Sequence, residues 1–157
     1  MTTTAPPADT KARTRHPAAP ALWAGLALSA LATVAPLLDV VSTGTIEAHV
    51  RATYPDWPQE WIDADTTALA AGLGVIGLLG IVGWLITLRA TARLRRWVPV
   101  VASVLWVVAA TVIASVTAAP MGAYDRLVPT GLGILAALPS LAGVVAVVQL
   151  WLYRVRR

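Results

Sequence analysis

The chain has 157 residues, of which 57% are hydrophobic and 13% are charged, about half of the roughly 25% that is usual in a soluble domain. Four stretches, at 17–38, 66–88, 97–124 and 127–153, contain no charged residue, and each is longer than the roughly 18 residues of a membrane-span candidate. The composition excludes a soluble globular protein and an intrinsically disordered one. It also speaks against nucleic acid as the partner of a chain whose net charge is +4.

The pattern predicts an all-α polytopic membrane protein, an antiparallel bundle of four transmembrane helices. Residues 1–17 are polar and rich in Thr, Ala and Pro, so we expect a disordered cytoplasmic tail. The first span is expected at about 18–41. A signal peptide cleaved at Ala30-Leu31-Ala32 is the alternative for this segment, but apolar residues continue to Leu38 and favour an uncleaved anchor.

Residues 42–65 form the longest connection, and they are acidic. Asp56 is expected to cap a short helix that begins at Trp57, with Gln59 as its capping-box partner. We expect that helix to continue into the second span. Because Asp63 and Asp65 are two residues apart, they would lie on different faces of a helix and would not chelate a metal together.

The second span is expected at about 66–88, the third at 97–118 and the fourth at 129–152. They are joined by a basic loop at 89–96 and by a tight turn, and 18–157 is expected to form one membrane domain. Small residues recur every four positions, which allows helices to approach closely in lipid and predicts a tight bundle. The rows are Ala21, Gly25, Ser29 and Thr33 in the first span, and Ala110, Ala114 and Ala118 beside Thr111, Ser115 and Ala119 in the third.

Basic residues predict the orientation of the chain. Apart from Arg51 and Arg126, every Lys and Arg lies in the tail, in the 89–96 loop or at the C-terminus, and an even number of spans places these segments on one side. The positive-inside rule assigns that side to the cytoplasm, so we expect a multi-pass protein of the cell (inner or plasma) membrane whose basic face attracts anionic lipid headgroups. The expected topology determinants are Arg89, Arg93, Arg95, Arg96, Arg154, Arg156 and Arg157.

Few residues offer chemistry. The chain has no cysteine and two histidines, His16 and His49, neither in a charge-free run. Thiolate chemistry, Cys-ligated zinc and bis-histidine haem between spans are therefore excluded. We predict no catalytic residue, no metal and no cofactor.

Five residues are the candidates for a functional role. Asp39 is an acid in the first span and would be functional by default if it were deep in the membrane. It lies close to the polar connection, so we expect it in the outer headgroup zone without a buried partner. Glu47 and His49 in the acidic connection could contribute to a cation site or an outer active site, although a solvated acidic surface is the simpler interpretation. Trp57 and Trp61 would share one helical face and anchor it at the interface.

Four short spans with both ends inside resemble, in outline, the small multidrug-resistance transporters and the DoxX-like four-span proteins. The resemblance to the former implies a carboxylate deep in the first span that couples protons to cationic drugs. The first span of this chain has only Asp39, near its outer end, so that property is not carried over. In outline the chain is similar to many small four-span bacterial membrane proteins.

The leading hypothesis is a non-enzymatic structural, accessory or regulatory membrane subunit, which binds a membrane-protein partner or a second copy of itself. One alternative is a small oligomeric transporter or channel for a hydrophobic or weakly polar solute, which would use Asp39 and a kink at Pro36. The other is a membrane enzyme with a site on the outer acidic loop.

The orientation is testable because the native chain has no cysteine. A single cysteine introduced into residues 89–96 should resist a membrane-impermeant thiol reagent added to intact cells, whereas one in residues 42–65 should react. Labelling of the 89–96 cysteine from outside would contradict the predicted topology.

Overall fold

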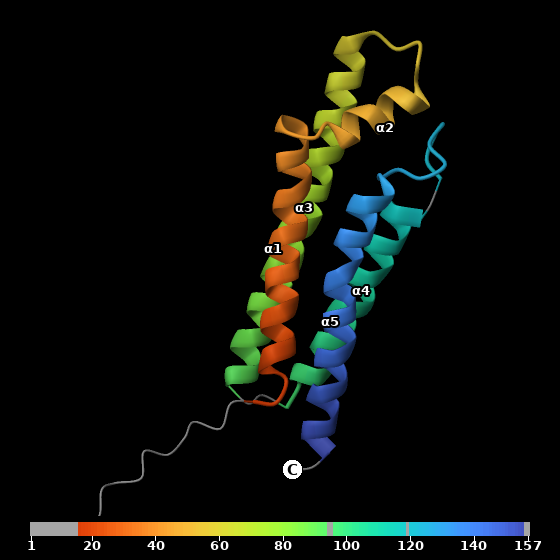
Figure 1. The fold of residues 1–157 in the computed structure, drawn as a ribbon. Helices are drawn as coiled ribbons and strands as arrows, with labels where there is room; N and C mark the ends of the chain where they lie inside the picture. Colours follow the sequence, from red (N-terminus) through yellow and green to blue (C-terminus); the bar gives the residue numbers. More distant parts are fainter. Residues whose placement is uncertain (1–15, 94–95, 119, 156–157) are drawn as a thin grey trace, which may run out of the picture.

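The computed structural model describes residues 16–93, 96–118 and 120–155, and it is all-helical over its regular elements. The predicted disordered tail therefore lies almost entirely outside the described residues. The five helices are α1 (Ala19–Val41), α2 (Thr45–Thr53), α3 (Gln59–Ala92), α4 (Val98–Ala118) and α5 (Thr130–Val155). Figure 1 shows α1, α3, α4 and α5 running side by side, with α2 lying across one end.

Four of these helices, α1, α3, α4 and α5, are long and apolar enough to cross a membrane. They confirm the four predicted spans and the fold class. The largest difference is in α3, which runs from residue 59 to residue 92 instead of 66 to 88. At 1.5 Å per residue its 34 residues are about 51 Å long, well above the roughly 30 Å of a bilayer's hydrocarbon core. This helix therefore has to extend beyond the core.

The extension of α3 helps to form a structure that we call the cap, which consists of α2, the connection at 54–58, residues 59–66 of α3 and the turn at 120–129. Helix α2 was not predicted, although Ile46 and Val50, one helical turn apart, are both buried. The predicted start of the next helix at Trp57, capped by Asp56, is wrong, because α3 begins at Gln59 and no side chain caps it. Pro58 stands at the cap position with an extended backbone, and Asp56 is exposed.

Close approach of α1 and α3 explains the small residues of the first predicted row. Gly25, Ser29 and Thr33 are buried on α1. A side chain added at Gly77 of α3 would lie 2.2 Å from Thr33 Oγ1 and 2.9 Å from its Cα. Gly74 and Gly80 on the same helix face Leu37 and Ser29 of α1. The predicted use of this row for helix packing is confirmed.

The two interior tryptophans fill spaces that glycines leave. Trp84 of α3 lies where a side chain on Gly25 would stand, and its Nε1 donates to Ser29 Oγ at 2.9 Å. Trp106 of α4 takes the corresponding place against Gly143 of α5. Both tryptophans therefore fill space between helices.

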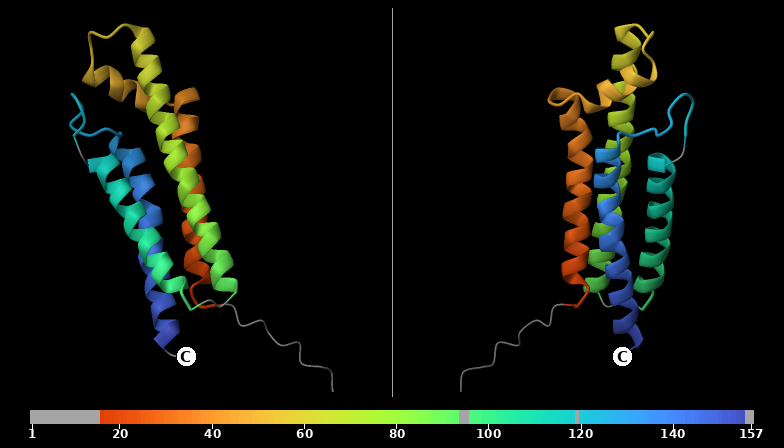
Figure 2. Two further views of the ribbon diagram at one scale, coloured as in Figure 1. Left: turned by 180° about the vertical axis from the view of Figure 1, so that it is seen from behind. Right: turned by 45° about the vertical axis from the view of Figure 1, so that its right-hand side comes forward.

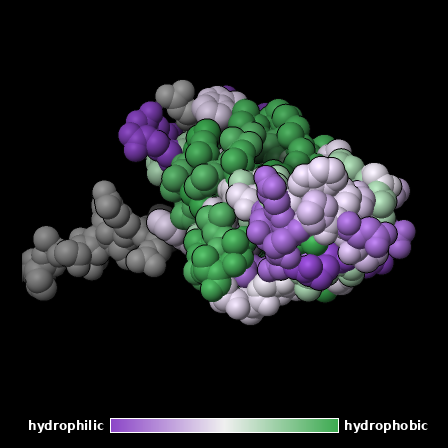
Figure 3. Space-filling view, turned by 90° about the horizontal axis from the view of Figure 1, so that it is seen from above, coloured by the Kyte–Doolittle hydropathy of each residue, from purple (hydrophilic) through white to green (hydrophobic). Residues whose placement is uncertain are grey.

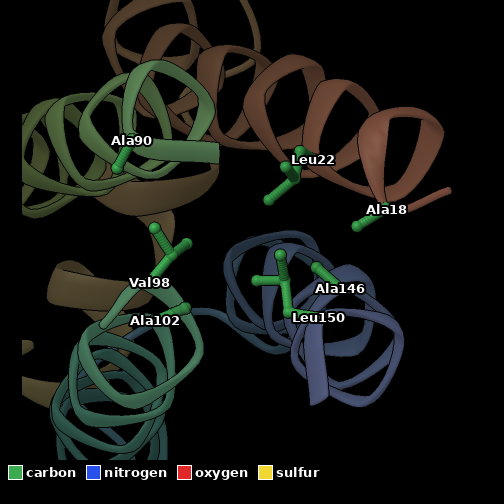
Figure 4. Close-up of a cluster of buried hydrophobic side chains, with 7 residues drawn as sticks. All are labelled: Ala18, Leu22, Ala90, Val98, Ala102, Ala146 and Leu150. Carbon is green, nitrogen blue, oxygen red and sulfur yellow. The ribbon is translucent and has the colours of Figure 1, made fainter. Parts of the chain in front are cut away.

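Two clusters of buried apolar residues close the bundle, one at each end. The cluster far from the cap takes side chains from four helices, which point toward one another in Figure 4: Ala18, Leu22, Ala90, Val98, Ala102, Ala146 and Leu150. The other cluster lies in and beneath the cap and contains Ile46, Val50, Ile62, Ala70 and Tyr124.

Between these clusters the bundle is not tight, contrary to expectation. A cavity of about 400 Å³ lies among α1, α3, α4 and α5. Most of the small-residue row of the third span does not pack within the chain either, since Ala114, Ala118, Thr111 and Ser115 are exposed. Ala110 is half-buried, and Ala119 lies outside the described residues. Helix α1 packs against both α3 and α5, and α5 also packs against α4, whereas α3 and α4 touch little. In the right-hand view of Figure 2, α4 stands at the outside of the bundle.

Substituting Gly77 by alanine should weaken the α1–α3 contact, because the new methyl group would overlap the backbone of Thr33. We expect the free energy of unfolding to fall by about 1–3 kcal/mol, measured by denaturant titration in micelles with tryptophan fluorescence. Gly83→Ala is the matched control, since nothing lies within 4 Å of its added side chain. Equal stability of the two variants would contradict the close packing.

Candidate functional site: the cap

The carboxylate of Asp39 connects α1 to the cap. Its Oδ1 accepts hydrogen bonds from the Thr43 hydroxyl and from the Thr45 amide at 3.1 Å, and its Oδ2 accepts one from the Ile46 amide at 2.8 Å. Only 6% of the residue is exposed. The expectation that Asp39 needs no buried partner is therefore wrong. The physical reason is that the chain turns sharply directly after α1 and brings the first amides of α2 onto this side chain.

The Asp39 side chain acts as the N-cap of α2, although it lies six residues before Thr45, the first residue of that helix. The first amides of a helix have no partner within it, and α2 has Gly44 at its cap position, which has no side chain to offer. Gly44 has φ of +62°, a left-handed conformation that glycine adopts without steric cost. Its amide donates to the Asp39 carbonyl at 2.9 Å. A charged acceptor at a helix N-terminus also interacts favourably with the helix dipole.

Glu47 belongs to a polar network that ties α2 to the start of α3. Arg51 Nη2 donates to Glu47 Oε1 at 2.8 Å and to Gln59 Oε1 at 2.5 Å. Gln59 Nε2 in turn donates to Asp63 Oδ1 at 2.7 Å. The hydrogen bonds from Arg51 and Gln59 lower the pKa of the Glu47 carboxyl. Gln59 is thus a bridge between two helices and not the capping-box residue that the sequence predicted.

Aromatic rings form a continuous series through the cap. Tyr54 and Trp57 stack with ring centroids 3.8 Å apart and planes 8° from parallel. Trp57 meets Trp61 edge-on at 5.9 Å, and Tyr54 meets Tyr124 edge-on at 5.3 Å. The predicted pairing of Trp57 with Trp61 is present as a contact, although Trp57 precedes α3 instead of lying in it. Trp61 is 57% exposed at the end of the series.

Tyr124 anchors the turn at 120–129 to the helices. Its hydroxyl donates to Asp65 Oδ2 at 2.5 Å. Burial, together with this hydrogen bond, raises the pKa of the Tyr124 phenol, so the group stays a donor. His49 of α2 stacks on the Tyr124 ring at 5.4 Å, and its Nε2 lies 2.8 Å from the Arg126 carbonyl oxygen.

The acidic residues and His49 of the outer connection lie in or near the cap, but they do not form a metal-binding group. Among the residues that the structure describes, no three His, Asp or Glu side chains gather as a metal-binding group. Glu47, His49 and Asp65 each have a specific partner within the cap. Viewed from the cap end, polar residues gather on one side of the face and apolar residues on the other (Figure 3).

The sequence did not identify the tyrosines as structural residues. Tyr54 and Tyr124 are far apart in the chain, and their sequence neighbours do not indicate that the two rings meet. A local signal for α2 did exist, because Glu47 and Arg51 are four residues apart and form a 2.8 Å ion pair. No local signal could have paired Tyr124 with Asp65, which lies 59 residues away.

The predicted topology residues lie at the other end of the bundle where the structure describes them. Arg89 is in the last turn of α3, Arg93 follows it, and Arg154 is in the last turn of α5. These three and Arg96 are exposed, whereas Arg95, Arg156 and Arg157 lie outside the described residues. At the same end the ring centroids of His16 and Tyr153 are 4.3 Å apart. The first and last parts of the described chain therefore lie close together.

Comparison with known proteins adds no relative: no family model matches the chain, and neither a curated protein nor a solved structure is detectably similar to it.

Removing the Asp39 carboxylate should loosen the cap. For Asp39→Ala we expect a loss of roughly 1–2 kcal/mol in the free energy of unfolding, the cost of deleting a helix cap, together with reduced near-ultraviolet circular dichroism from the stacked cap aromatics. Asp56→Ala, at an exposed position in the same connection, should leave both signals unchanged. Unaltered stability of Asp39→Ala would show that these hydrogen bonds do not hold the cap.

Proposed function

We propose that this integral membrane protein is a non-enzymatic accessory or regulatory subunit, which uses the cap to bind a membrane-protein partner. The four apolar helices would hold it in the cell membrane with both termini in the cytoplasm. In that orientation the cap stands on the outer side and the arginine-rich end contacts anionic lipid headgroups on the inner side.

One observation carries the proposal: the carboxylates of Asp39, Glu47 and Asp65 are hydrogen-bonded to groups that hold the cap together. Asp39 accepts from three donors, and Asp65 accepts from Tyr124. Glu47 pairs with Arg51. A general acid, base or ligand must be able to reach a substrate or an ion, so side chains fixed in this way support a binding role more than a catalytic one.

The exposed rim of the cap has the character of a recognition surface. Trp61 is largely exposed at the end of the aromatic series, and the neighbouring Asp56 and Glu60 are exposed as well. Exposed aromatic residues are frequent anchors in protein interfaces. A partner with basic and apolar side chains near the membrane surface would complement this rim.

The two other hypotheses have less support. A transporter that couples its cycle to Asp39 would need this carboxylate to change its partners, and the first turn of α2 depends on it. An enzyme on the acidic connection would need Glu47 or His49 to be free for substrate, and both are bound within the cap.

The proposal predicts a complex that depends on the cap. The tagged full chain should recover a membrane partner or a second copy from native membranes in mild detergent, after cross-linking in intact cells. Trp61→Ala should reduce this recovery several-fold, because it removes the exposed ring without touching the Asp39 hydrogen bonds.

Trp23→Ala is the matched control, since Trp23 is 60% exposed on α1, far from the cap. It should leave recovery unchanged. Isolation of the chain alone under every condition, or equal loss with both variants, would contradict binding through the cap.

A further inference from the structure

The cavity inside the bundle lies at the depth of the membrane-spanning helices. Its walls come from α1, α3, α4 and α5, and the two buried clusters close it toward the ends. Leu22 and Ala146 belong both to its wall and to the cluster far from the cap, and Leu132 belongs to its wall near the cap cluster. At about 400 Å³ it falls in the range of roughly 300–1,000 Å³ that small-molecule sites occupy.

The exposure of the wall residues shows where the cavity opens. Wall residues on α1 and α5, such as Pro36 and Ala136, are buried or half-buried. On α3 the wall includes Leu79, Val82 and Ile86, and on α4 it includes Leu105, Val108 and Val112, all six exposed. Each set of three follows helical spacing along one face. The mouth therefore lies between α3 and α4, and it faces sideways.

The chemistry of the walls selects an apolar occupant. None of the described residues that line the cavity is charged. Both indole N–H groups are donated within the bundle, Trp84 to Ser29 Oγ and Trp106 to the Ser140 carbonyl, each at 2.9 Å. The Thr87 hydroxyl donates to the Gly83 carbonyl. A buried water needs two to four polar partners, and an empty apolar space forfeits the dispersion contacts of its walls.

We propose that this cavity is a lateral binding site for the hydrocarbon chain of a membrane phospholipid, which enters between α3 and α4. Both helices are long and apolar enough to span the bilayer, so the mouth opens onto lipid chains. The chain would lie against α5 around Ala136 and Pro139, and the headgroup would remain outside the mouth. The site is separate from the cap, and its occupancy does not depend on a protein partner there.

Photo-cross-linking of the full chain tests the site. We would reconstitute it in phosphatidylcholine vesicles that contain a lipid with a carbene-generating diazirine in one acyl chain, irradiate them, and locate adducts by peptide mass spectrometry. We expect adducts on the inner wall, at Ala136 and Pro139, as well as at the exposed Leu141 and Val145 of α5. Adducts confined to outward-facing residues in the wild-type chain would overturn the proposal, whatever the variants do.

A cavity-filling variant sharpens the test. Ala136→Phe should lower inner-wall adducts at least fivefold and leave those at Leu141 unchanged. Ala114→Phe is the control, because Ala114 is exposed on α4 and does not line the cavity, and it should change neither. Undiminished inner-wall adducts in Ala136→Phe would also overturn the proposal.

Discussion

The hydrogen bonds of Asp39 are the interaction on which the arrangement of the molecule depends. They join the last turn of α1 to the first amides of α2 across a turn of three residues. Without this carboxylate the Thr45 and Ile46 amides would lose their acceptor. The Ile46 amide would then be unpartnered in a buried place, which costs more than a missing surface hydrogen bond. Because α2 then lies across the end of α3, the same contact decides where the aromatic series and the turn at 120–129 can pack.

Within the membrane-spanning part, the size of the side chains decides which helices touch. No hydrophobic force draws helices together in lipid, so close packing requires small residues. Gly77 lets α3 lie directly on Thr33 of α1. Among the glycines that the structure describes, none gives α3 and α4 a comparable contact. Along the cavity their residues, such as Val82 and Val108, are branched and exposed. The tight packing of α3 on α1 and the open seam between α3 and α4 thus both follow from the need for small residues at close helix contacts.

The cap and the membrane-spanning helices differ in the chemistry of their side chains. In the cap, polar groups are paired with one another, and an aromatic and acidic rim remains exposed. In the spanning helices, the polar groups at the cavity are few, and its indoles are bonded internally. Both features are the basis of the two proposals, a protein partner at the cap and a lipid chain in the cavity.

The sequence by itself determined the number of spans, their approximate limits and the segregation of charge, because each of these depends on runs of neighbouring residues in a medium without water. It also identified the α1 row that packs on α3, since spacing of four places residues on one helical face. It could not determine that Asp39 is buried, because the burial follows from the turn after Val41 that brings α2 onto this side chain. The bond between Tyr124 and Asp65, and the open seam between α3 and α4, were decided by tertiary structure. Each depends on which helices become neighbours, and residues far apart in the chain determine that.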